Sequence, residues 1–206
     1  IEYNNHMKKR FYLIRHGEKV KHIGDPPISE KGVIQAKATG KYFKKIPIKK
    51  ILSSPILRAK QTAQHISDKL SIDFVTEELL KERVNWGDGE PSDFQDFLVW
   101  WDRASEERDW VPPIGDSSRK AGERLQKLIS SYAGDDDQIL LVTHGGIITD
   151  FLRNVFNEEI LDAKVTDFSK SRDKSIHECS VTVVDYDSIS STYELIELAS
   201  TKHLQR

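Results

Sequence analysis

Two short apolar segments, each followed closely by a histidine and a glycine, constrain this chain more than any other feature. The segment 11–14 leads, after one arginine, into His-Gly at 16–17, and 138–142 leads, after one threonine, into His-Gly at 144–145. Apolar runs of this length are typical of buried strands, and a glycine beyond the strand lets the backbone approach a ligand closely. The pattern predicts a phosphate site built from two histidines at strand ends.

Arg15 and His16 supply complementary chemistry at the first of these strand ends. The guanidinium of Arg15 is a planar cation suited to oxyanions. The imidazole of His16 is uncharged and nucleophilic near neutral pH. His16 is therefore either a contact to the ligand or a nucleophile that attacks it.

The rest of the chain alternates strand-like and helix-like segments. Strands are predicted at 9–14, 50–53, 73–75, 138–143, 180–186 and 192–198. Helices are predicted at 29–43, 54–70, 117–132 and 147–155. We expect Ser29 to cap the first helix, and Ser54 followed by Pro55 to begin the second. This alternation predicts an α/β fold of three layers, with helices on both faces of a mostly parallel sheet.

The stretch 84–116 departs from the alternation and holds all four tryptophans. Ser92 and Gln95 form a capping-box pattern. The apolar positions that follow share one helix face, and they are Phe94, Phe97, Leu98 and Trp101. Two interpretations remain open, for this face and for Trp86: aromatic packing on the domain, or a helical insertion that covers the site as a lid with an apolar wall.

Length and composition favour one domain in a reducing compartment. A chain of 206 residues suits a single α/β domain, expected at 7–206. Residues 1–6 before Met7 are expected to be a remnant of the expression vector outside this domain. The 31 basic and 33 acidic residues nearly balance, which argues against nucleic-acid or membrane partners. One cysteine excludes an internal disulfide. We expect a cytoplasmic monomer or homodimer.

Four motifs occur in a fixed order along the chain: Arg-His-Gly-Glu at 15–18, a helix start at 28–36, Ser-Ser-Pro with a downstream arginine at 53–63, and Thr-His-Gly-Gly at 143–146. In this order they resemble the histidine phosphatase superfamily, also called phosphoglycerate mutase-like. The resemblance implies a phosphomonoester hydrolase that forms a phosphohistidine intermediate. It further implies that neither a metal nor another cofactor is needed and that the partner is a small phosphorylated substrate.

The resemblance also assigns roles to individual residues. His16 would be the nucleophile, and Arg15 and Arg58 would clamp the phosphoryl oxygens with guanidinium forks. His144 would hydrogen-bond a phosphoryl oxygen as charge develops. The backbone N–H of Gly145, at a helix start, would add a donor where the helix dipole favours anions.

Glu82 is the predicted acid that protonates the leaving oxygen, because its segment resembles the one that carries the acid in the family. The rival carboxylates are Glu18, Glu77, Glu78 and Asp88. Arg83 is expected to contact the substrate beyond its phosphate, or else to be a solvated charge.

Charged side chains in the loop after the nucleophile form a second candidate group. Lys19 and His22 are expected to line the mouth of the pocket, with solvent exposure as the alternative. Together with Trp86 they complete the predicted substrate-binding set.

Two other functions remain as alternatives. A phosphoglycerate mutase is disfavoured because its opening motif continues with a Trp-Asn pair, whereas 19–22 is Lys-Val-Lys-His. Mutases also carry adjacent arginines before a proline-rich stretch, but Arg103 and Arg108 before Pro112 are not adjacent. A non-catalytic phosphate-binding module would be expected to lack the nucleophile, an arginine or the second histidine, and all of these are present.

Overall fold

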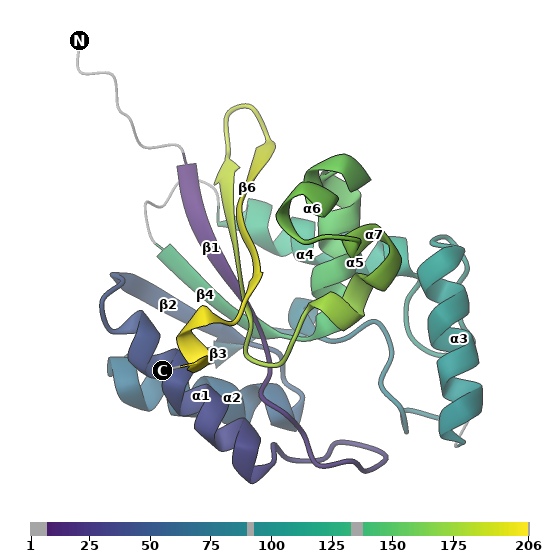
Figure 1. Ribbon diagram of the computed structural model, residues 1–206, viewed down its shortest axis with the longest axis horizontal. Helices are drawn as coiled ribbons and strands as arrows, with labels where there is room; N and C mark the ends of the chain where they lie inside the picture. Colours follow the sequence, from purple (N-terminus) through teal and green to yellow (C-terminus); the bar gives the residue numbers. More distant parts are fainter. Residues whose placement is uncertain (1–7, 90–92, 133–137, 206) are drawn as a thin grey trace.

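The computed structural model describes residues 8–89, 93–132 and 138–205. Within these ranges, six strands form one mixed sheet with helices on both faces, so the chain is a single α/β domain (Figure 1). The expected vector remnant at 1–6 and the predicted capping residue Ser92 lie outside the described residues.

The strands occupy the predicted positions with small shifts at their ends. They are β1 Lys8–Arg15, β2 Ile48–Ser53, β3 Phe74–Thr76, β4 Gln138–Thr143, β5 Val181–Asp187 and β6 Thr192–Ser200. Their order in the sheet is β3-β2-β4-β1-β5-β6. The first four in this order pair in parallel, whereas β5 and β6 are antiparallel. The mostly parallel sheet is therefore confirmed, with an antiparallel edge that the sequence reading did not specify.

Seven α-helices lie in the described part of the chain. They are α1 Glu30–Phe43, α2 Leu57–Leu70, α3 Phe94–Glu106, α4 Ser118–Ser131, α5 Gly145–Val155, α6 Glu158–Lys164 and α7 Phe168–Ser171. Short 3-10 turns occur at η1 Glu78–Leu80, η2 Arg172–Ser175 and η3 Lys202–Gln205. The helices α6 and α7 were not predicted from the sequence.

Side-chain alternation along β1 divides the core into two layers. Phe11 and Leu13 pack with apolar residues of α4, α5 and α6. Tyr12 and Ile14 point to the other face and pack with α1 and α2. This period-2 burial on both faces explains why β1 reads as a continuous apolar run.

The central strands β1 and β4 bring the two His-Gly motifs together. Arg15 pairs with Thr143 in the parallel register, and the backbone N–H of His16 donates to the Thr143 carbonyl at 2.9 Å. Both histidines therefore leave the sheet at the carboxyl ends of neighbouring strands, where ligands bind in α/β sheets.

The start of α2 differs from the prediction. The helix begins at Leu57, and its N-cap residue Ile56 makes no side-chain cap. Instead, the Leu57 N–H donates to both oxygens of the Asp25 carboxylate, at 2.9 and 3.0 Å. Ser54 and Pro55 lie before the helix, so a loop 32 residues upstream supplies the capping group that we assigned to Ser54.

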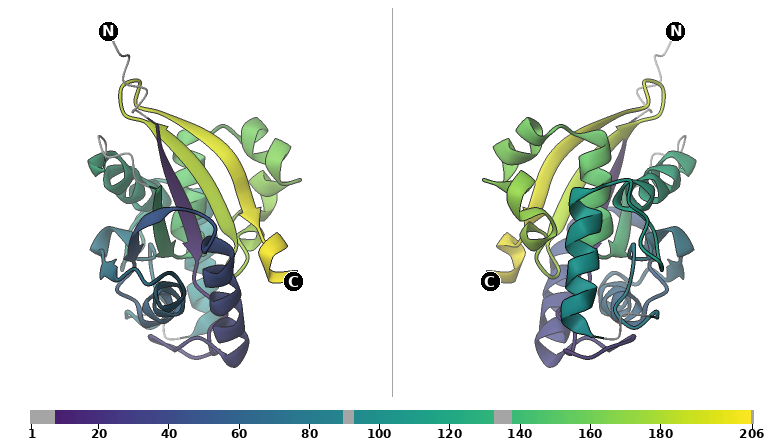
Figure 2. Two further views of the ribbon diagram at one scale, coloured as in Figure 1. Left: turned by 90° about the vertical axis from the view of Figure 1, so that its left-hand side faces the viewer. Right: turned by 90° about the vertical axis from the view of Figure 1, so that its right-hand side faces the viewer.

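The aromatic helix α3 lies at one side of the molecule, away from the sheet (Figures 1 and 2). Its N-cap is Asp93, whose carboxylate accepts from the Gln95 and Asp96 N–H groups. Phe97 and Trp101, which share one side of α3, are half-buried. Val99, on the other side of the helix, is 65% exposed.

Candidate active site

A cavity of about 260 Å³ opens at the carboxyl ends of β1 and β4. Its polar floor comes from the strand ends, α2 and the start of α5, and consists of Arg15, His16, Lys19, Arg58, Glu82, Gly145 and Gly146. Its apolar wall is Val84, Trp86, Phe94, Phe97, Leu98 and Trp101, and Asn85 and Asp173 complete the lining.

His16 lies buried at the floor with both ring nitrogens engaged. Its Nδ1 lies 2.7 Å from the Gly17 carbonyl, which can only accept, so Nδ1 carries the proton. Its Nε2 accepts a hydrogen bond from Arg58 Nε at 3.1 Å. Burial, followed by the charges of Arg58 and Arg15, lowers the pKa of His16 well below its usual value. The imidazole is thus neutral at physiological pH, with a lone pair on Nε2.

His144 lies beside His16, with ring centroids 5.3 Å apart. It is fully buried between β4 and α5, and its Nε2 is 2.8 Å from the hydroxyl oxygen of Ser54. Burial and the Arg58 charge lower the pKa of His144 well below its usual value. Ser54 therefore orients the second histidine, a role that our sequence reading assigned to no residue.

Arg15 and Arg58 approach the histidines from different elements. Arg15, at the end of β1, donates to the Ile176 carbonyl at 2.6 Å and pairs with Glu178 at 2.7 Å. Arg58 lies in the first turn of α2 and is 4% exposed. A Cβ at Gly145 would lie only 3.3 Å from Arg15 Cδ, so the glycine leaves room for this guanidinium.

Three buried nitrogen atoms close to His16 lack a hydrogen-bond partner among the described residues, although one of them, Arg58 Nη1, lies 4.0 Å from an Asp25 carboxylate oxygen. The three atoms are Arg15 Nε, Arg58 Nη1 and His144 Nδ1. The lining of the cavity includes the two arginines but not His144. Buried polar groups are normally hydrogen-bonded, so unpaired ones mark a ligand or solvent position. The two arginines bring positive charge to this position, and together the three groups suit a tetrahedral oxyanion.

Glu82 lines the floor of the cavity next to the start of α5. One carboxylate oxygen accepts from the Gly146 N–H and the other from the Ile147 N–H, both at 2.9 Å. The carboxylate thus lies at the N-terminus of α5, where the helix dipole favours negative charge. A Cβ at Gly146 would lie 2.6 Å from Glu82 and 2.5 Å from Trp101, so only glycine lets these two side chains meet here.

None of the four rival carboxylates lines the cavity. Glu18 pairs with Lys31 at 2.7 Å, and Glu77 accepts from the Leu79 N–H. Lys81 pairs with Glu78. The remaining rival, Asp88, is exposed and bonds within its own turn.

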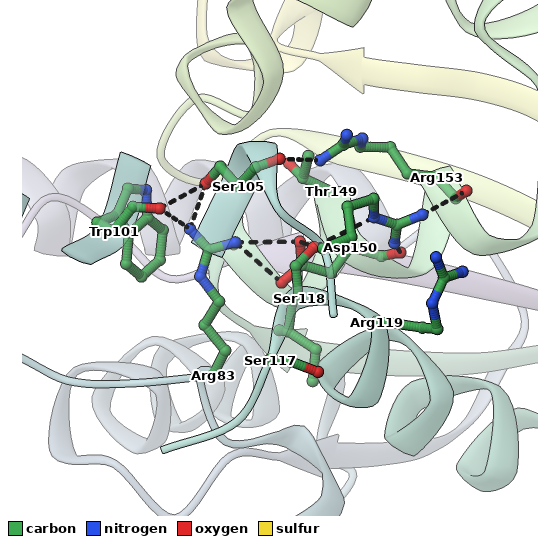
Figure 3. A network of polar contacts seen from close by, with 12 residues as sticks. Arg83, Trp101, Ser105, Ser117, Ser118, Arg119, Thr149, Asp150 and Arg153 are labelled. Atoms are coloured by element: carbon green, nitrogen blue, oxygen red, sulfur yellow. Dashed lines mark hydrogen bonds and ion pairs between the residues drawn. The ribbon is translucent and has the colours of Figure 1, made fainter. Parts of the chain in front are cut away.

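Arg83 does not reach the cavity, contrary to our expectation of a substrate contact. Its guanidinium is 2% exposed and donates to Asp150 on α5 at 3.1 Å (Figure 3). It also donates to the Trp101 carbonyl at 3.0 Å and to the Ser105 hydroxyl on α3. The residue directly after the predicted acid Glu82 therefore links α3 to α5.

Of the two residues expected at the mouth of the pocket, one lines the cavity and the other does not. Lys19 is half-buried in the lining, and burial together with the charges of Arg58 and Arg15 lowers its pKa. His22 is exposed, with its Nδ1 2.7 Å from the Ile23 carbonyl. The position of Lys19 fits the predicted role, and that of His22 fits the solvated alternative.

Trp86 and the α3 stripe face the cavity. Adjacent rings lie 4.8 Å apart between Trp86 and Phe94, and 5.9 Å apart between Phe97 and Trp101. Of our two interpretations, the apolar wall agrees with this placement better than packing in the core.

The described residues contain neither a metal-binding cluster nor a membrane-spanning helix. In ranges 8–89, 93–132 and 138–205, no group of three or more His, Cys, Asp or Glu side chains is placed to hold a metal ion. The helices described there include none that is both long enough and apolar enough to cross a membrane.

Comparison with known proteins agrees with this geometry. The model of the histidine phosphatase superfamily (branch 1) matches residues 11–198. The chain belongs to this superfamily. The uncharacterised phosphatase PhoE of Bacillus subtilis is 29% identical over 152 residues, covering 69% of this chain and 75% of PhoE.

Two further relatives extend the comparison. A 2,3-bisphosphoglycerate-dependent phosphoglycerate mutase of Bartonella bacilliformis is 27% identical over 180 residues, covering 75% of this chain and 86% of the mutase. The native structure of a mycobacterial glucosyl-3-phosphoglycerate phosphatase superposes with a TM-score of 0.70 at 21% identity. That alignment covers 94% of this chain and all of the other, and it confirms the fold.

Proposed function

We propose that this protein hydrolyses phosphomonoesters through a phosphohistidine formed on His16. The observation that carries the proposal is that buried nitrogens of Arg15, Arg58 and His144 have no hydrogen-bond partner among the described residues and lie close to a neutral histidine. Phosphatase relatives within the superfamily support the same reaction.

In the first step, the Nε2 lone pair of His16 attacks phosphorus and the bond to the alcohol oxygen breaks. Arg15, Arg58 and His144 hold the equatorial oxygens, whose charge must be balanced in the transition state. The leaving oxygen takes a proton from the carboxyl group of Glu82, which must therefore hold a proton in the substrate complex although the α5 N-terminus favours its charged form.

In the second step, a water molecule attacks the phosphohistidine. Glu82, now a carboxylate, takes a proton from this water while the N–P bond breaks. Inorganic phosphate leaves, and His16 and the protonated Glu82 are restored. Each bond broken is matched by one formed, and the protein returns to its starting state.

Transfer to a second substrate, as in a mutase, is less well supported by the site. A phosphoglycerate carboxylate needs cationic partners, yet among the described lining residues Lys19 is the only cation besides Arg15 and Arg58, which the phosphate takes. Arg103 pairs with Glu107, and Arg108 donates to the Asp150 and Arg153 carbonyls. Water is therefore the proposed acceptor.

Trapping the intermediate tests the proposal. The protein is mixed with ³²P-labelled p-nitrophenyl phosphate and quenched in base, and the labelled peptide is sequenced. We expect a base-stable, acid-labile phosphoryl group on His16, and none in His16→Ala. A label on serine, aspartate or cysteine contradicts the mechanism, and phosphate binding without turnover or label indicates a binding module.

A further inference from the structure

We propose that the preferred substrates are small phosphomonoesters whose alcohol portion is apolar and uncharged, such as a single aromatic ring on a short chain. This inference rests on the proposed phosphatase function and concerns the alcohol portion of the substrate, which is the leaving group. It follows from the division of the cavity into a charged floor and an apolar wall.

The cations of the cavity all belong to the floor. Arg15 and Arg58 flank His16, and both lower the pKa of Lys19, which places its ammonium in the same electrostatic environment. Among the described lining residues these three are the only cations, so the apolar wall offers none for a second anionic group. Asp173 in the lining adds negative charge that disfavours a substrate carboxylate.

The wall is a continuous row of rings. Trp86 and Phe94 lie 4.8 Å apart, Phe94 stacks on Phe97 at 6.3 Å, and Phe97 and Trp101 lie 5.9 Å apart. These are the separations at which aromatic side chains attract one another. Phe94 is 43% exposed although it belongs to this row, so the wall presents apolar surface that a ligand can cover.

Hydrogen bonds hold the wall in place at its first ring. The Gly24 N–H donates to the Trp86 carbonyl at 2.9 Å, and the Asn85 side chain donates to the Gly24 carbonyl at 2.9 Å. The loop after the nucleophile is therefore fastened to the segment that carries Trp86. Arg83 anchors the last ring, with its guanidinium carbon 3.7 Å from the Trp101 centroid.

The cavity volume limits the size of the substrate. At about 260 Å³ it is slightly smaller than the ~300–1,000 Å³ of most small-molecule sites. Since the phosphate occupies the floor, the remaining space suits one ring or a short branched chain. A nucleotide or a sugar bisphosphate would place polar groups against the aromatic row.

The experiment compares primary-alcohol phosphates whose alcohol portions differ in polarity. These are 3-phenylpropyl phosphate, glycerol 3-phosphate and phosphoserine, with p-nitrophenyl phosphate as an activated reference. Covering one ring favours the apolar substrate by about tenfold or more. We therefore expect kcat/KM for 3-phenylpropyl phosphate to exceed that of either polar substrate by at least that factor.

Variants of α3 assign any preference to the wall. Phe97→Ala should lower kcat/KM for 3-phenylpropyl phosphate far more than for the polar substrates, and so remove most of the preference for the phenylpropyl group. The matched control is Val99→Ala on the same helix, because Val99 is 65% exposed and does not line the cavity. Should Phe97→Ala unfold, Trp86→Ala tests the other end of the row.

The outcomes separate this inference from the proposed function. Turnover of p-nitrophenyl phosphate without a preference for the phenylpropyl ester overturns the substrate class and leaves hydrolysis standing. A preference for phosphoserine that Lys19→Met abolishes also overturns it, because Lys19 would then hold a carboxylate. No turnover of p-nitrophenyl phosphate, with no label on His16, overturns the proposed function itself.

Discussion

The guanidinium carbon of Arg83 lies 3.7 Å from the centroid of the Trp101 ring. The same side chain is ion-paired with Asp150 on α5 and follows the proposed acid Glu82 in sequence. One buried cation therefore joins the segment of the acid, the aromatic wall and the helix that begins at the site (Figure 3). Because Arg83 and Asp150 are both buried, substitutions of this pair test the contact through the free energy of unfolding.

We expect Arg83→Met to lower the free energy of unfolding by about 3–5 kcal/mol, because it leaves Asp150 buried without its ionic partner. The double variant Arg83→Met/Asp150→Leu should recover most of this loss, since both polar groups are then removed together. Urea denaturation measures each value. Lys170→Met, which breaks an exposed pair with Asp167, is the control and should change little. A double variant as unstable as Arg83→Met alone would contradict this prediction.

Arg58→Gln should shift the acid side of the pH profile of kcat/KM to higher pH. Burial is the largest cause of the lowered pKa of His16, and the Arg58 charge is the next. Without that charge the pKa of His16 rises, so more of the nucleophile is protonated at a given acidic pH. Both enzymes are assayed with p-nitrophenyl phosphate, so ionisation of the substrate is common to both. An acid limb that stays in place, or moves as it does in the surface variant Arg119→Gln, would argue against His16 as the titrating nucleophile.

Glu82→Gln should impair 3-phenylpropyl phosphate far more than p-nitrophenyl phosphate. An alkoxide must be protonated as it leaves, whereas nitrophenolate leaves without much help. The measurement is kcat/KM for the two substrates. Glu18→Gln is a matched control because Glu18 pairs with Lys31 outside the cavity. Equal losses on both substrates in Glu82→Gln would remove Glu82 from the acid role.

Gly146→Ala should reduce turnover of alkyl phosphates without unfolding the protein. The new methyl group would lie 2.6 Å from a Glu82 oxygen and 2.5 Å from a Trp101 ring carbon, so both side chains must move. Kinetics on the alkyl and activated substrates measure the effect. Gly89→Ala serves as the control, because Gly89 does not line the cavity and the atom nearest to its new methyl group is the terminal Cδ1 of Ile114, which can rotate away. Full activity in Gly146→Ala would show that the acid does not need its present position.

Local patterns explain why much of the fold could be predicted. The strands β1 and β4 are buried on both faces, so they read as apolar runs whose ends are marked by glycine. Ser29 caps α1 as expected, accepting from the Gly32 N–H. These features depend on neighbours within a few residues, which a single sequence displays.

Features that depend on distant parts of the chain were missed. Asp25 caps α2 from a separate loop, and Ser54 instead contacts His144, 90 residues away. The direction of Arg83 is set by Asp150, 67 residues further on. The local signal for such contacts is a polar residue next to apolar ones, as at Asp150 before Phe151 and Leu152 in α5, and this signal identifies no partner. The antiparallel edge likewise depends on how β5 meets β1 in the folded sheet.

The order of the strands has a consequence for how such an enzyme can change over evolutionary time. The two histidines directly follow the adjacent central strands β1 and β4. A shifted register of these strands would turn core side chains to the wrong face of the sheet. The aromatic row is carried instead by a peripheral helix and a loop, which tolerate replacement. Mutations in the aromatic row can therefore change which alcohol portion the site accepts, while the sheet keeps the two histidines in place.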